Sequence, residues 1–463
     1  MGTRPCLLAL PFGECQRSNR ARVYCQAPGN SRPGAVPTSW SCCSICLPWQ
    51  PWGCAAASLC QANAAATGIP QTVEARVNYI MPFDVRLGAP SEDPASNRQC
   101  RRLVASWLLA VATMVLVMIV LGGVTRLTGS GLSIMEWAPF AGTFPPMTEA
   151  EWQRLFQLYQ QIPQYALVNE GMTLAGFTQI FWLEWVHRLW GRLIGLAFIV
   201  PLIWLWVTGR IERRLRPRLL LLCLLGGLQG AVGWFMVASG FFPEATAVSP
   251  YRLVVHLAFA LALYVALLWI GLSVLRPVPP PPRASLLLRG LVWLCCASVV
   301  LTILAGGFVA GTRAGLAYNT FPLMDGRLVP EGYADLEPFA RNLTENLAAV
   351  QFDHRLLAML ALVAVTATVI VGFATSRQRA VRLAVVALLV VAVTQYMLGV
   401  ATLLLVVPTA LAAAHQAVAA LLLAAAVVLV HATRPLSVDR AIRVAKAPLT
   451  HHLNGWIIDE DPP

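Results

Sequence analysis

Apolar residues form eight long runs along the chain, and polar segments separate them. Each run has about 20 residues or more, the length that an α-helix needs to cross the hydrocarbon core of a bilayer. The expected spans are residues 103–124, 177–207, 218–238, 252–275, 288–310, 347–374, 382–406 and 409–431. The pattern therefore predicts an all-α membrane protein with eight transmembrane helices.

Composition supports this fold class and explains the charge. Hydrophobic residues make up 57% of the chain and charged residues 12%, with a mean hydropathy of +0.64. A soluble domain has about 25% charged residues. The net charge of +12 comes almost wholly from arginine, since Lys446 is the only lysine. The arginines fall mainly in short loops between apolar runs, where they indicate membrane topology and not a nucleic-acid partner.

The placement of the arginines also predicts the orientation. Arginine-rich segments precede the first span and follow the second, fourth and sixth spans, so they share one side of the membrane. The positive-inside rule makes that side, and both termini, cytoplasmic. The opposite side receives two long loops, about 127–176 and 311–346, which we expect to cover a site. In the first loop, Thr148 and Glu151 have the spacing of a capping box and predict an amphipathic surface helix.

The two ends of the chain differ from the apolar region. Residues 1–97 hold eight of the twelve cysteines among scattered Pro, Gly, Ser and Arg. Cys43 and Cys46 form half of a metal or redox signature that has no second half. We interpret residues 1–97 as a disordered extension or an artefact of the translation start, with the working protein beginning near Met81. Residues 434–463 are expected to be a cytoplasmic tail.

The chain contains an internal repeat. The segment Gly122–Leu132 aligns without gaps to Gly306–Leu316, and three further matches follow in the same order. These matches are His187-Arg188 with His354-Arg355, Gln229-x-x-x-Gly233 with Gln395-x-x-x-Gly399, and His256 with His415. A Pro-rich linker, 277–284, divides the halves 98–276 and 285–433. Because each half has four spans, we predict two four-helix bundles related by a pseudo-twofold axis along the membrane normal.

Four histidines occupy matched positions in the outer part of the even-numbered spans. They are His187, His256, His354 and His415. A lone membrane histidine is usually a packing residue, but four in a repeated arrangement favour metal or heme. Zinc or copper would need further ligands close by, whereas heme needs only axial ligands. Arg188 and Arg355, which follow two of the histidines, are candidates to contact heme propionates, with snorkelling as the alternative.

One difference between the halves is chemical. Glu184 lies three residues before His187, and the matching position in the second half is Gln351. A buried carboxylate is costly at membrane depth and therefore indicates function. Beside a porphyrin it can stabilise developing positive charge or move protons, and an amide cannot titrate. We therefore expect the chemistry in the half with Glu184, while a structural ion pair with Arg188 is the alternative.

These motifs resemble those of the heme A synthase family, membrane enzymes that convert heme O to heme A for cytochrome oxidase. The matching segments are Gly122–Ser133, Trp137–Pro139, Glu184–Arg188, Ala314–Gly326 and Val350–Arg355, with His256 and His415. The resemblance implies that the C8 methyl of heme O is oxidised to a formyl group by successive hydroxylation. It implies a heme b cofactor on His354 and His415, a substrate heme between His187 and His256, and an essential role for Glu184.

The resemblance also implies a setting. The first outer loop, 127–176, has no cysteine, so the chain resembles the cysteine-free branch of the family found in proteobacteria and mitochondria. We expect a bacterial inner-membrane protein surrounded by lipid, with heme O synthase as a candidate partner and an electron-transfer partner of unknown identity. Two other classes stay open, a non-catalytic bis-histidine diheme cytochrome and a transporter built from two four-helix repeats.

Overall fold

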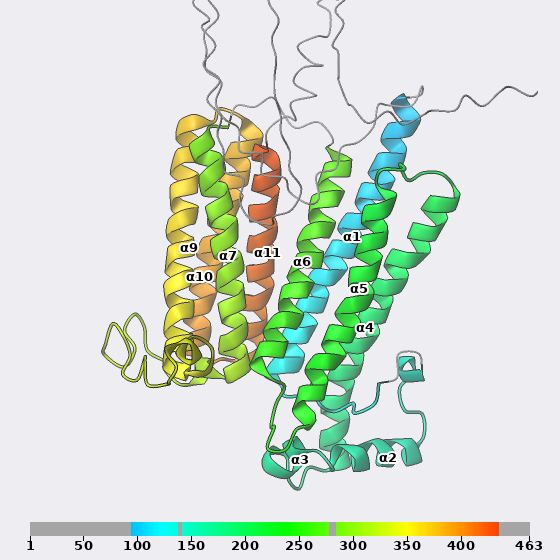
Figure 1. The fold of residues 1–463 in the computed structure, drawn as a ribbon, viewed down its shortest axis with the longest axis vertical. Coiled ribbons are helices and arrows are strands. Elements are labelled where there is room, and N and C mark those ends of the chain that lie inside the picture. Colours follow the sequence, from blue (N-terminus) through cyan, green and yellow to red (C-terminus); the bar gives the residue numbers. More distant parts are fainter. Residues whose placement is uncertain (1–93, 138–140, 277–283, 435–463) are drawn as a thin grey trace, which may run out of the picture. The chain divides into compact units, whose positions relative to one another are not determined.

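The computed structural model describes residues 94–137, 141–276 and 284–434, which all belong to one compact unit, Asn78–Pro463. Within these residues eight helices are long and apolar enough to cross a membrane, which confirms the predicted fold class. Their bounds are α1 Pro94–Leu127, α4 Leu174–Val207, α5 Arg216–Val237, α6 Pro250–Leu275, α7 Leu286–Thr312, α9 Leu347–Thr375, α10 Arg379–Leu404 and α11 Thr409–Thr433. Figure 1 shows their arrangement.

The predicted spans agree with these helices to within a few residues at most ends. The exception is the first helix, since α1 begins at Pro94 and the expected span at residue 103. The extension before Pro94, almost all of the Pro-rich linker and the tail beyond Arg434 lie outside the described residues. The predictions made for those segments stay predictions.

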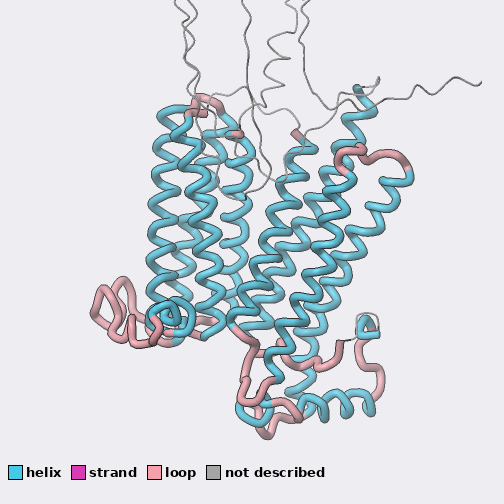
Figure 2. The backbone as a smooth tube through the Cα atoms, viewed as in Figure 1, coloured by secondary structure: helices cyan, strands magenta, loops and turns pink. Residues whose placement is uncertain are grey.

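Three shorter helices occupy the two long loops. They are α2 Glu149–Tyr159, α3 Pro163–Val168 and α8 Asn342–Glu345. Helix α2 is the predicted amphipathic helix: the Thr148 hydroxyl accepts a hydrogen bond from the Glu151 amide, and Leu155, Phe156 and Tyr159 are buried on one face. Figures 1 and 2 show α2 and α3 running across the ends of the spans of the first half.

Side-chain caps begin several of the spans. Thr173, Ser285 and Asn346 accept hydrogen bonds from the first turns of α4, α7 and α9. Such caps satisfy amide groups that have no partner within the helix. The caps on α4 and α9 belong to the two spans that carry the carboxylate or amide, the histidine and the arginine. The sequence thus fixes where both spans begin and how deep those side chains lie.

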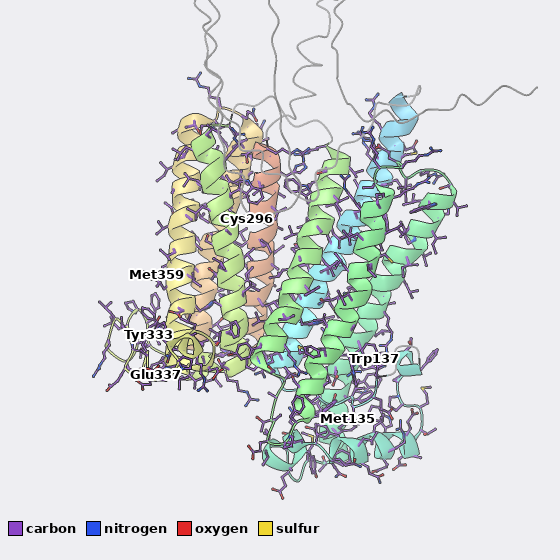
Figure 3. The ribbon with its side chains drawn as sticks, viewed as in Figure 1. Met135, Trp137, Cys296, Tyr333, Glu337 and Met359 are labelled. Atoms are coloured by element: carbon purple, nitrogen blue, oxygen red, sulfur yellow. The ribbon has the colours of Figure 1, made fainter. Side chains whose placement is uncertain are left out.

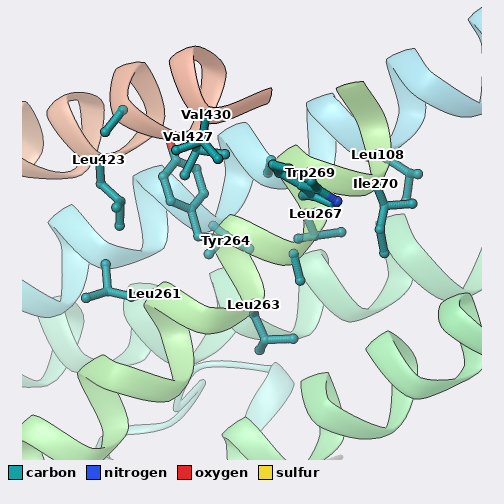
Figure 4. Close-up of a cluster of buried hydrophobic side chains, with 14 of the residues drawn as sticks. Leu108, Leu261, Leu263, Tyr264, Leu267, Trp269, Ile270, Leu423, Val427 and Val430 are labelled. Carbon is teal, nitrogen blue, oxygen red and sulfur yellow. The ribbon is translucent and has the colours of Figure 1, made fainter. Parts of the chain in front are cut away.

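The main apolar core lies where the two halves meet. Helices α1 and α6 of the first half pack against each other, and α11 of the second half packs against both. Figure 4 shows Leu108, Tyr264 and Ile270 from α1 and α6, with Leu423 and Val427 from α11, in this cluster. Because lipid tails are as apolar as these side chains, van der Waals packing is what stabilises the contact between the halves.

Candidate functional site

Each of the four histidines packs against a glycine of a neighbouring helix in its own half. A Cβ on the glycine would lie 2.9 or 3.0 Å from the histidine Cε1 in every case, closer than nearly all real Cβ contacts. The pairs are Gly122 with His187, Gly233 with His256, Gly306 with His354 and Gly399 with His415. The absence of a side chain at these four positions therefore provides the space for the imidazole rings.

The two adjacent glycines of each repeat contact different parts of the protein. Gly122 and Gly306 face a histidine of their own half, whereas Gly123 and Gly307 face the other half. A Cβ on Gly123 would overlap the amide of Gln416, which crosses from α11 and donates a 2.8 Å hydrogen bond to the Ile119 carbonyl of α1. The first glycine of the motif thus leaves space for a histidine, and the second leaves space for side chains of the other half.

His354 and His415 face each other in the second half. Their ring centroids are 6.5 Å apart and their planes cross at 85°. Metal–nitrogen bonds of about 2 Å on both sides of one iron, plus roughly 1 Å from each nitrogen to its ring centre, would separate the centroids by about 6 Å. The pair therefore fits bis-histidine ligation of one heme iron.

His187 and His256 form the corresponding pair in the first half. Each imidazole rests on its glycine as in the second half. Among the residues that the structure describes, no three His, Cys, Asp or Glu side chains gather around one point. Each histidine pair thus suits a group that brings its own equatorial ligands, as heme does.

The glutamines of the repeat lie beside two of the imidazoles, a contact that the sequence did not indicate. Gln395 places its amide nitrogen 3.1 Å from Nδ1 of His415, and Gln229 places its own 3.2 Å from Nδ1 of His256. Each glutamine lies one helical turn before the glycine against which the ring packs, which gives the repeated Gln-x-x-x-Gly spacing. A ligating histidine donates from its free ring nitrogen to its partner, so the glutamine oxygens, which are buried and have no partner among the described residues, are the atoms of these amides that could hold the rings in that way.

Glu184 is buried, with 3% of its surface exposed, and both oxygens accept hydrogen bonds. The Ser133 hydroxyl and the Ile134 amide donate to Oε2 over 2.8 and 2.9 Å. Arg188 donates to Oε1 from Nε and Nη2 over 3.0 and 2.6 Å. The ion pair considered as an alternative therefore exists, and Glu184 also anchors the first outer loop on α4.

Gln351 anchors the second outer loop with the opposite polarity. Its amide nitrogen donates to the Ala314 and Tyr318 carbonyls over 3.0 and 3.2 Å, and its oxygen accepts from Arg355 over 3.1 Å. A carboxylate could not donate these two bonds. The helix thus carries Glu where the loop presents hydrogen-bond donors, and Gln where the loop presents carbonyl oxygens.

The two arginines bind the loops as well as the anchors. Arg188 donates to the carbonyls of Ile134 and Glu136, and Arg355 to those of Tyr318 and Thr320. These bonds assign both arginines a structural task in holding the loops. Their contact with propionates stays a prediction.

An exposed ion pair and aromatic contacts stabilise the first loop further. Arg154 on α2 binds Glu136 at 2.8 Å, and this hydrogen bond lowers the pKa of the Glu136 carboxyl. The Trp137 indole meets Trp234 of α5 edge to face, with centroids 5.1 Å apart. Figure 3 shows Met135 and Trp137 at the same end of the first half as α2. The loop therefore contacts α4, which carries His187, and α5, whose Gly233 contacts His256.

Comparison with known proteins agrees with this geometry. The family COX15-CtaA, described as a cytochrome oxidase assembly protein, matches residues 105–427. The chain belongs to the COX15-CtaA family. The match begins within α1 and ends within α11, so it contains both histidine pairs and both anchored loops.

Several relatives have been named. The heme A synthase of Granulibacter bethesdensis is 62% identical over 304 residues, which cover 66% of this chain and 80% of the relative. Heme A synthase 2 of Acidiphilium cryptum is 47% identical over 320 residues, or 68% of this chain and 87% of the relative. The heme A synthase of Rhodospirillum centenum is 46% identical over 316 residues, or 68% and 84%.

Proposed function

We propose that this protein is a heme A synthase, an oxidoreductase that converts heme O to heme A by oxidising the C8 methyl to a formyl group. The observation that carries the proposal is the pair of bis-histidine sites, each seated on its own glycines, in a chain 62% identical to a heme A synthase. Two heme sites in one chain suit a reaction that needs a heme substrate and a heme cofactor.

The second half, 285–433, is assigned to the cofactor. His354 and His415 would hold heme b, and their 6.5 Å centroid spacing supports this role. Heme b supplies one-electron redox chemistry when bound. Gln351 and Arg355 keep the covering loop in place, and neither provides a titratable carboxylate beside the site.

The first half, 98–276, is assigned to the substrate. His187 and His256 flank heme O, and Glu184 provides a carboxylate at the position where the second half has Gln351. Because donors occupy both of its oxygens, we assign Glu184 an electrostatic role, stabilising positive charge that develops at the oxidised methyl. Arg188, Ser133 and the Ile134 amide hold the carboxylate in a fixed position for this task.

The membrane setting forms part of the proposal. The eight spans make this a multi-pass membrane protein, and we assign it to the bacterial inner membrane with both termini cytoplasmic. The two halves are assigned to a pseudo-twofold arrangement, and the cysteine-free first outer loop to the branch without loop thiols. Heme O synthase is the proposed partner for substrate delivery, because it makes the substrate.

The second candidate is a diheme cytochrome that only transfers electrons. It shares the histidine pairs, but electron transfer requires neither the buried Glu184 nor loops anchored over both sites. Expression in cells that make heme O but lack heme A separates the two functions. Heme A in the extracted pigment is the expected result, and unchanged heme O would leave the cytochrome as the better assignment.

A further inference from the structure

His187 differs from the other three site histidines in its hydrogen bonding. Nδ1 of His354 lies 3.1 Å from the Thr302 carbonyl of α7, and glutamine amides lie beside Nδ1 of His256 and His415. Nδ1 of His187 is buried and has no hydrogen-bond partner among the described residues. The two halves therefore hold their first histidine differently, although both rings rest on a glycine.

The repeat identifies the bond that is missing. Thr302 stands four residues before Gly306, and Met118 stands four residues before Gly122. The Met118 carbonyl of α1 is thus the counterpart of the acceptor that His354 uses. His187 is as close to its glycine as His354 is, with Cε1 at 3.0 and 2.9 Å from the respective Cβ positions. The two histidines therefore differ in whether Nδ1 reaches a carbonyl of the neighbouring helix.

The side chains between the helices provide a physical cause. Trp190 of α4 lies three residues after His187, and the matching residue after His354 is the smaller Leu357. The Trp190 indole donates a 2.9 Å hydrogen bond to the Met114 carbonyl, so it sits between α4 and α1. Helix α9 contacts α7 more extensively than α4 contacts α1. Because the spacing of packed helices follows the side chains at the contact, Trp190 keeps the two backbones apart.

We infer that His187 is the exchangeable axial ligand of the substrate heme, and that Trp190 is the positioning residue that keeps it exchangeable. The inference rests on the proposed function and deepens it. A hydrogen bond on the far nitrogen fixes a ligating imidazole and makes it a stronger ligand, and loss of such a partner costs about 10- to 100-fold in metal affinity. A cofactor should stay bound, whereas a substrate must enter and its product must leave.

Heme transfer from the purified protein to excess apomyoglobin tests the inference. The wild type should release heme in two phases, the faster one carrying heme O or heme A and the slower one heme b. Trp190→Leu, which copies Leu357, should slow the faster phase by about tenfold by allowing Nδ1 of His187 to reach the Met118 carbonyl. The slower phase should not change. Trp204→Leu, an exposed tryptophan at the cytoplasmic end of α4, is the matched control and should change neither phase.

A measurement on the unaltered protein covers the case in which Trp190→Leu does not fold. Added imidazole should displace His187 and change the spectrum of the first-half heme at concentrations that leave heme b unaffected. Equal release rates for both hemes, or imidazole binding at the heme b site first, would overturn the inference while heme A formation continued. Absence of any heme O or heme A from the protein would overturn the proposed function itself.

Discussion

His354 and Gly306 are in such close contact that a Cβ on the glycine would lie 2.9 Å from Cε1 of the ring. The glycine comes from α7 and the histidine from α9, so the contact sets the position of the ring between two spans. The same relationship recurs three times along the chain. The position of each proposed ligand therefore depends on a residue that cannot itself bind heme.

Gly306→Ala should release heme b. The added methyl must push the His354 ring away, and overpacking of this kind costs about 1–3 kcal/mol. Heme b per protein, measured by pyridine hemochrome after purification, should fall severalfold. Gly290→Ala on the same helix meets nothing within 4 Å and should retain full heme b, since alanine is the better helix former. Equal heme content in the two variants would contradict the glycine–histidine contact.

Glu184→Gln should keep heme b bound and stop heme A formation. The substitution preserves the shape of the side chain but removes the negative charge that we assign to the reaction. Ser133→Ala removes one donor to the same carboxylate and leaves its charge, at a cost of about 1 kcal/mol. Extracted hemes should show heme O accumulating in the first variant, while the second still makes heme A. If both variants lose heme A equally, loop anchoring is the whole role of Glu184.

Gln351→Glu tests the polarity of the second anchor. The carboxylate would face the Ala314 and Tyr318 carbonyls, to which the amide now donates. Lost hydrogen bonds and buried unsatisfied groups should cost about 1–3 kcal/mol. We expect a lower thermal unfolding midpoint in detergent, with Leu328→Ala, whose side chain is exposed on the same loop, as control. A midpoint equal to that of the wild type would show that the loop does not depend on Gln351.

The Glu136–Arg154 pair should make the first loop weakly sensitive to acid. The pair lowers the folded pKa of Glu136 below its ordinary value of 4.5, so its stabilisation is complete above that value and disappears as the pH falls through the folded pKa. Both side chains are about half exposed, which limits the effect to about 1 kcal/mol or less. Protease cleavage of the loop should rise below pH 4.5 in the wild type, whereas Glu136→Gln should show the raised cleavage already at neutral pH.

Much of the fold could be predicted because membrane helices have simple requirements. The length of each apolar run and the arginines between runs locate all eight spans. The repeat also predicts that His354 pairs with His415, and these two rings face each other. The capping-box residues Thr148 and Glu151 likewise mark α2. These signals depend on neighbours along the chain, so no tertiary information was needed to read them.

The arrangement within the site could not be predicted in the same way. Which side chain Gly122 or Gly399 faces depends on how each helix is rotated about its axis, and helical spacing alone does not determine that rotation. The choice of Glu184 or Gln351 depends on whether the loop offers amide donors or carbonyls, which is a property of loop backbone. The unpartnered Nδ1 of His187, which we attribute to Trp190, depends on how α4 packs against α1.

The most direct measurement is the identity of the hemes that each half holds. We would purify His187→Ala/His256→Ala and His354→Ala/His415→Ala from cells that make heme O, and resolve the extracted hemes by mass. The first variant should retain heme b and lack both heme O and heme A. The second should lack heme b, hold heme O and make no heme A. Loss of heme b from the first variant, or heme A made by the second, would contradict the division between a substrate half and a cofactor half.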